Sequence, residues 1–128
     1  MLISKRPNNA YKKTQVEAQA AASTSIELIR MLHVKLAEEI EKIAFHIERK
    51  NIELKATAAQ KSMDILIALD SSLDLSSGNE LINNLHRIYE YSIRQIYEAS
   101  KNSDVNEINK LKPILQDIKE GWEGLGGQ

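Results

Sequence analysis

The chain has 128 residues, and the 42% that are apolar are enough for one domain with one hydrophobic core. Its 17 basic and 18 acidic residues nearly cancel, so we expect no nucleic-acid partner, because nucleic-acid binding usually requires an excess of positive charge. The absence of cysteine excludes disulfide bonds and cysteine-based zinc or redox chemistry.

The N-terminal stretch lacks the features of a targeting segment. The sequence "MLISKRPNNAYKK" carries positive charge but no apolar run of signal-peptide length. Nowhere in the chain do about eighteen uncharged apolar residues follow one another, as a membrane-spanning helix requires. We therefore expect a cytoplasmic protein without stable membrane insertion.

Residues 8 to 25 read "NNAYKKTQVEAQAAASTS" and contain many alanine, serine and threonine residues with little to bury. A helix as short as 16–22 is marginal in water, so it should dock and undock at low cost. Two interpretations of residues 1–22 follow. They form either a solvated tail or a displaceable lid whose anchors would be Tyr11 and Val16.

Apolar residues at steps of three and four predict helices for most of the remaining chain. The first is expected over 24–49, where Thr24 and Glu27 have the spacing of a capping box. The second is expected over 51–74, with Asn51 as its N-cap. The first apolar stripe is Ile26, Ile29, Leu32, Leu36, Ile40, Ile43 and Ile47, and the second is Ile52, Ala56, Ala59, Met63, Leu66 and Leu73.

The third helix is expected over 79–100, after the turn "DLSSGNE". Gly78 interrupts the helical pattern there, and Ser77 and Glu80 have the spacing of another capping box. The next turn, "KNSDVNE", ends this helix, and Asp104 with Glu107 begins the last one.

The fourth helix is expected over 104–123, and Pro113 lies inside its apolar pattern. A proline lacks the N–H that a helix interior needs and its ring clashes with the preceding turn. Pro113 therefore predicts either a kink near Lys110 or a restart in which it stands in the first turn. The terminal "GLGGQ" is expected to fray.

The predicted helices of about 20 residues and their short connections favour helices that fold back on their neighbours. We expect an all-α fold, an antiparallel up-and-down four-helix bundle with a short extra N-terminal helix or lid segment. Residues 1–128 would form a single domain.

The helix expected over 79–100 has more apolar surface than one stripe requires. At about 100° per residue, its apolar residues spread over roughly half the circumference, against the ~100° typical of a core-facing stripe. One explanation is a central helix that contacts two neighbours, and the other is a groove for a partner helix. The apolar set is Leu81, Ile82, Leu85, Ile88, Tyr89, Ile93, Ile96 and Tyr97.

The sequence carries no pattern that indicates catalysis, a cofactor or a metal site. None of the histidines has a glutamate three residues before it, and there is no His-Glu-x-x-His pair. Phosphate-binding glycine loops and the Gly-x-Ser-x-Gly elbow are also missing. Neighbouring acids such as Glu38 and Glu39 lie among lysines, as on a solvated helix face. We do not expect an enzyme.

One alternative function is histidine phosphotransfer, because small helical bundles also perform it. The stretch "MLHVKLAEE" contains His33 with Lys35 nearby, but Leu36 and Ala37 stand where that family usually has small residues. Since His33 directly follows Leu32 on the apolar stripe, the pattern favours a histidine at the rim of that face. A purely structural helical interaction module is the other alternative.

Several stretches, in their order along the chain, resemble the flagellin export chaperones of the FliS family. They are "NAYKKTQVEAQ", "IELIRML", "AFHIERKNIELK", "SSLDLSSGNELINNLHRIYEYSIRQIYEASKNSDVNEI" and "GWEGL". The resemblance covers about residues 8–125. This chain departs from the family pattern at His33, Val34 and Lys35, where Tyr-Asp-Gly is common, and in the missing proline before "IELI". Pro113 is also unusual for the family.

The resemblance implies a helical bundle that binds the disordered C-terminal segment of flagellin in the cytoplasm. Such a chaperone prevents premature polymerisation and helps deliver flagellin to the flagellar type III export gate. Its N-terminal segment would cover part of the client surface when flagellin is absent. Monomer and homodimer both stay open.

The residues expected to contact the partner lie on three parts of the chain. Apolar residues of the long helices could equally belong to the core, because a stripe faces the bundle by default. The candidates are Tyr11, Thr14 and Val16 in the lid, Ile29, Leu32 and Leu36 on the first long helix, and Tyr89, Ile93 and Ile96 on the third.

Overall fold

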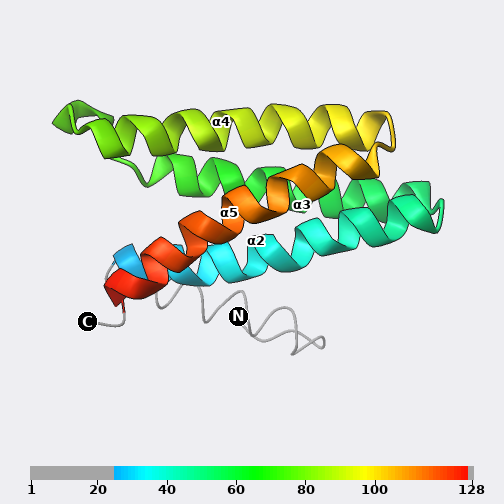
Figure 1. Ribbon diagram of the computed structural model, residues 1–128, viewed down its shortest axis with the longest axis horizontal. Helices are drawn as coiled ribbons and strands as arrows, with labels where there is room; N and C mark the ends of the chain where they lie inside the picture. Colours follow the sequence, from blue (N-terminus) through cyan, green and yellow to red (C-terminus); the bar gives the residue numbers. More distant parts are fainter. Residues whose placement is uncertain (1–24, 127–128) are drawn as a thin grey trace, which may run out of the picture.

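The computed structural model describes residues 25–126, which form four long α-helices and one short 3-10 helix (Figure 1). The predicted all-α bundle is confirmed for this part of the chain, whereas the segment 1–22 lies outside the described residues. No helix within 25–126 is long and apolar enough to cross a membrane. The elements are α2 (Ser25–Glu48), α3 (Ile52–Ser71), η2 (Leu75–Ser77), α4 (Glu80–Lys101) and α5 (Val105–Gly126).

Consecutive helices run in opposite directions, and α5 crosses the others obliquely (Figure 1). It begins beside the C-terminal end of α4 and ends beside the N-terminal end of α2. Packing is extensive between α2 and α3, between α2 and α5, and between α3 and α4, and it is sparser between α4 and α5. The helices α2 and α4 therefore lie at opposite corners of the bundle.

Side chains fix the helix starts at three connections. The Asn51 side chain accepts a hydrogen bond from the Leu54 N–H at 3.0 Å, so the predicted N-cap is confirmed. Asp104 likewise accepts from the Glu107 N–H at 3.2 Å. The capping box predicted at Ser77 is wrong, because Asn79 caps α4 by accepting from two N–H groups of its first turn. Ser77 belongs to η2 instead.

The buried face of α3 is narrow and differs from the predicted stripe. Ile52 is 71% exposed and Ala56 is also exposed, so the start of that stripe was wrong. The periodicity could not choose between two faces of α3, because apolar residues occur on both. The buried residues are Lys55, Ala58, Ala59, Ser62, Leu66 and Leu69. Small buried side chains at 58, 59 and 62 allow α3 to approach its neighbouring helices closely.

The helix α5 runs through Pro113 without interruption, so a restart at this residue is wrong. The Pro113 side chain is exposed, as is Asn109 four residues earlier. Pro113 has no N–H, so the carbonyl of Asn109 lacks its helical hydrogen-bond donor. This carbonyl lies on the solvent side of α5, where water can replace the donor. The helix also continues to Gly126, into the stretch expected to fray.

Candidate functional site

A buried polar pair joins α2 to α4 in the core. The Nε2 atom of His33 lies 2.9 Å from the hydroxyl oxygen of Tyr89, and each residue is 1% exposed. The position of His33 at the rim, expected from sequence, is therefore wrong. The His33 ring turns inward because the helix places it between the buried Ile29 and Leu36 of the same stripe.

Burial sets the protonation of this pair. Desolvation, aided by the charge of Lys119 and opposed by Glu123, lowers the pKa of His33 to about 4. Burial also raises the pKa of the Tyr89 phenol to about 12, against an opposing hydrogen bond with Trp122. Both groups are neutral at pH 7, and His33 Nδ1 has no hydrogen-bond partner within residues 25–126. A phosphate donor cannot reach either nitrogen in this fold, which argues against phosphotransfer.

The predicted contact residues occupy three environments. Ile29, Leu36, Tyr89 and Ile96 belong to the buried core, so a partner reaches them only if the bundle opens. Leu32 and Ile93 are partly buried and pack against that core. The lid residues Tyr11, Thr14 and Val16 lie outside the described part of the chain.

The broad apolar surface of α4 packs on two neighbouring helices, α3 and α5. His86 on one flank reaches Asp70 of α3, with its Nδ1 atom 2.6 Å from a carboxylate oxygen. The expectation that this helix contacts two neighbours is thus confirmed by its packing on α3 and α5. The apolar surface nevertheless exceeds what these neighbours cover, since Leu81, Tyr91 and Tyr97 are exposed.

Exposed and partly buried apolar side chains lie on the neighbouring flanks of α3 and α4, which we call the α3–α4 face. Ile93 and Tyr97 follow His86 by two and three helical turns on the α4 side. Because Asp70 contacts His86, it marks the side of α3 that lies next to α4. Ile67, which is 51% exposed, lies on the same side of α3. The apolar members of this face are Ile52, Met63 and Ile67 of α3 and Ile93 and Tyr97 of α4.

A charged cluster crosses the α3–α4 face near the start of α4. His86 Nδ1 lies 2.6 Å from an Asp70 carboxylate oxygen, and its Nε2 lies 3.3 Å from a Glu90 carboxylate oxygen. The hydrogen bond with Asp70 raises the pKa of His86 above its ordinary value. Since Asp70 and His86 belong to different helices, the cluster fixes their relative positions.

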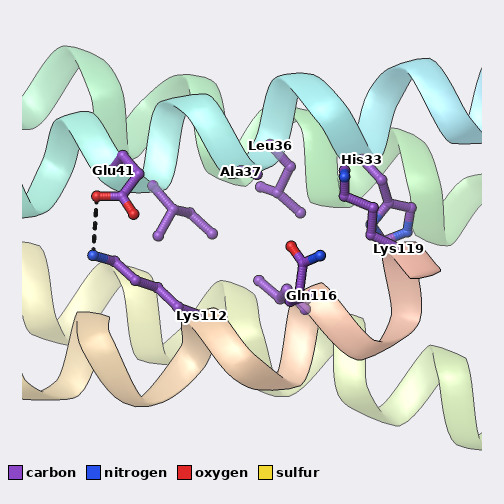
Figure 2. A pocket seen from close by; sticks show the side chains of 9 residues that line it. His33, Leu36, Ala37, Glu41, Lys112, Gln116 and Lys119 are labelled. Atoms are coloured by element: carbon purple, nitrogen blue, oxygen red, sulfur yellow. Dashed lines mark hydrogen bonds and ion pairs between the residues drawn. The ribbon is translucent and has the colours of Figure 1, made fainter.

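A pocket opens between α2 and α5, on the side of the bundle away from that face (Figure 2). Its volume is about 100 Å³, far below the ~300–1,000 Å³ of a typical cofactor site. The walls are formed by the buried side chains of Leu36, Ile40 and Leu115, and His33 closes one end. Ala37 of α2 and Gln116 of α5 border the opening.

The charged groups around this pocket and the Gln116 amide are paired within the chain, whereas the buried Nδ1 atom of His33 has no hydrogen-bond partner among the described residues. Lys112 Nζ lies 3.0 Å from Glu41 Oε1, an ion pair that links α5 to α2 (Figure 2). Lys119 pairs with Glu123 at 3.0 Å. Gln116 donates a hydrogen bond to the Glu120 side chain at 2.9 Å. No sequence pattern could reveal this pocket, because it arises where a small and a flexible side chain meet across two helices.

The described residues contain no group of three or more histidine, cysteine, aspartate or glutamate side chains that could hold a metal ion. On α2, Lys35 and Lys42 both pair with the buried Glu39, and Lys35 also pairs with Glu38. These two ammonium groups lower the Glu39 pKa although burial opposes them. The Glu39 carboxylate is therefore a charged group held in place by its two lysine partners.

Comparison with known proteins agrees with the chaperone resemblance of the sequence. The family described as "Flagellar protein FliS" matches residues 7–128. The flagellar secretion chaperone FliSB of Pseudomonas aeruginosa is 30% identical over 90% of this chain and 91% of that protein. The flagellar secretion chaperones FliS of Vibrio cholerae and Salmonella typhimurium are 28% and 27% identical, each over 91% of this chain and over 85% and 87% of those proteins. The chain therefore belongs to the FliS family of flagellar proteins.

Proposed function

We propose that this protein is a non-enzymatic export chaperone for flagellin. It binds the disordered C-terminal segment of flagellin in the cytoplasm, prevents premature polymerisation and assists delivery to the flagellar export gate. The observation that carries this proposal is family membership along nearly the whole chain, together with relatives named as flagellar secretion chaperones.

The α3–α4 face supports the proposal physically. A disordered client pays a conformational cost when it becomes helical, so binding requires a broad apolar surface. Ile67, Ile93 and Tyr97 provide such a surface between two helices. An amphipathic client helix would lay its apolar residues along this seam, with Ile93 as the predicted contact residue that the fold leaves partly open.

The segment 1–22 would act as the displaceable lid, with Tyr11, Thr14 and Val16 as its contacts. Its alanine-rich composition permits a helix that contributes little burial and leaves at low cost. Deleting residues 1–18 should therefore tighten flagellin binding or speed association, as measured by stopped-flow fluorescence. Unchanged affinity and rates would argue for a solvated tail.

A polymerisation assay tests the proposed function. Monomeric flagellin is seeded with short filament fragments, and light scattering follows filament growth with and without an equal amount of this protein. We expect growth to be suppressed. Flagellin that lacks its C-terminal segment serves as the control in a direct binding assay, where it should not bind. Filament growth at an unchanged rate in the presence of the folded protein would contradict the chaperone activity.

A further inference from the structure

We infer that residues 114–126 of α5, which we call the C-terminal arm, open from the bundle as a separate unit with Pro113 as its boundary. In the open form the arm would lose its helix while α2, α3, α4 and the first part of α5 stay folded, as in local unfolding. The inference goes beyond the proposed function and does not depend on it, because it concerns only how this chain holds its own last helix.

The first part of α5, residues 105–112, is held firmly. Ile108 is 0% and Leu111 is 1% exposed, so both side chains lie fully inside the core. Lys112 Nζ lies 3.0 Å from Glu41 Oε1 and links this part of the helix to α2. Asp104 caps the first turn. Opening of residues 105–112 would therefore disrupt the core itself.

The C-terminal arm is held less firmly. Its residues Ile118 and Trp122 are only partly buried where they pack against the core. The ion pair between Lys119 and Glu123, 3.0 Å long, joins two residues of the arm to each other, so it does not attach the arm to α2. Trp122 attaches the arm to α4 through its hydrogen bond with Tyr89.

The sequence of the arm does not keep it helical without packing. Pro113 removes one helical hydrogen bond between the two parts of α5. The arm contains Gly121, Gly124 and Gly126, and each glycine lowers helix propensity. An isolated helix shorter than about 12–15 residues is marginal in water, so an arm that leaves the bundle should unfold.

The contact between the arm and α2 is loosely packed. The pocket of about 100 Å³ lies behind Leu115 and reaches His33. A more open hollow of about 220 Å³ lies between Arg30 of α2 and Glu123 of the arm. Side chains that line such spaces have fewer contacts than those of a close-packed interior. On the other side of the arm, α5 also packs sparsely on α4.

An open arm would uncover a defined part of the core. Leu36 and His33 of α2 line the pocket together with Leu115 of the arm, and all three side chains are buried in the closed form. Departure of Leu115 would bring Leu36 and His33 to solvent without unfolding of the bundle. The arm would thus control when these residues are accessible.

The first experiment uses Trp122, which is the single tryptophan of the chain and lies in the arm. In urea, the tryptophan fluorescence of the full-length protein should change at a lower concentration than the ellipticity at 222 nm, which follows all helices. Pro113→Ala should bring the two transitions together, because the helix then continues through residue 113. Asn109→Ala is the matched control on an exposed position one turn earlier, and it should leave the two transitions apart. Coincident transitions in the parent would overturn the inference.

The second experiment distinguishes opening as a unit from fraying of the helix end. Native-state hydrogen exchange should show one shared opening for the amides of residues 116–123, on the order of ten-fold or more faster than for Leu111 and nearly independent of low urea concentrations. The amide of Leu66 in α3 should exchange only through an opening that urea strongly favours. Exchange that rises steadily toward residue 126 without a step at Pro113 would indicate fraying and overturn the inference. Equal urea dependence for the arm and for Leu66 would indicate global unfolding and also overturn it.

Discussion

The hydrogen bond between His33 Nε2 and the Tyr89 hydroxyl, 2.9 Å long, connects two helices at opposite corners of the bundle. The helices α2 and α4 share few other contacts, because α3 and α5 lie between them. This buried pair therefore ties the two halves of the core together. The Tyr89 hydroxyl thereby supplies a partner for a histidine that is buried in the core.

Removal of one partner of this pair should destabilise the fold. In Tyr89→Phe the Nε2 atom of His33 loses its partner while buried, which costs about 1–3 kcal/mol of unfolding free energy. Urea denaturation measures the change, and Tyr97→Phe on the exposed side of α4 should stay within about 0.5 kcal/mol of the parent. The double variant His33→Leu, Tyr89→Phe should lose less than the sum of the single variants, because neither polar group is then left unpaired. Strict additivity would contradict the pairing.

The low pKa of His33 makes stability depend on pH in a defined window. The pKa of His33 is about 4 in the folded chain and 6.5 in the unfolded chain. Below pH 6.5 the unfolded chain therefore binds a proton that the folded chain excludes. The free energy of unfolding should fall as pH decreases from about 6.5 to about 4, by on the order of 3 kcal/mol from this group. Replacing His33 by leucine together with Tyr89→Phe should flatten that dependence, whereas His46→Gln should not. A parent and double variant with the same pH profile would contradict the assignment.

His86 should behave in the opposite way. Its pKa is raised, chiefly by the hydrogen bond with Asp70, so the stabilisation from the charged form is complete below pH 6.5 and is lost as pH rises through the folded pKa. NMR titration of the imidazole Hε1 signal measures that pKa directly. Asp70→Asn should lower it toward the ordinary value, and Asp64→Asn, on an exposed position of the same helix, should not. An unchanged His86 pKa in Asp70→Asn would show that the contact is absent in solution.

A charge on the α3–α4 face should weaken client binding. Ile67→Asp on α3 places a carboxylate where the flagellin helix would bury apolar groups. Ile93→Asp does the same on α4. Leu54→Asp is the matched control, because Leu54 is 48% exposed and Ile67 is 51% exposed on the same helix, but Leu54 lies on the flank that faces away from α4. We expect a loss in affinity on the order of ten-fold for Ile67→Asp and no change for Leu54→Asp. Equal losses for both would mean that the effect is general rather than local.

The sequence predicted the bundle well because helix periodicity and caps are local signals. Stripes such as that of α2 and caps such as Asn51 depend on residues within a few positions. Its prediction for α3 failed at Ile52 and Ala56, since apolar residues lie on two faces and only packing decides which face is buried. Asn79 replaced Ser77 as the cap of α4 because η2 takes up the preceding residues.

The candidate site was predicted only in part. Ile93 is accessible at its edge, but Tyr89 and Ile96 are in the core, because a broad apolar helix does not reveal which of its residues its neighbours cover. The burial of His33 was missed since its partner Tyr89 is 56 residues away in the chain. The α2–α5 pocket had no signal in the sequence, because it depends on which residues of two distant helices oppose one another.

The most direct test of the chaperone assignment is calorimetric titration of the full-length protein with the C-terminal segment of flagellin from the same organism, with circular dichroism of the mixture. The account predicts saturable binding near equal stoichiometry and a helical signal greater than the sum of the separate components, because the client folds as it binds. Absence of binding by a protein whose own helical spectrum shows it to be folded would contradict the account.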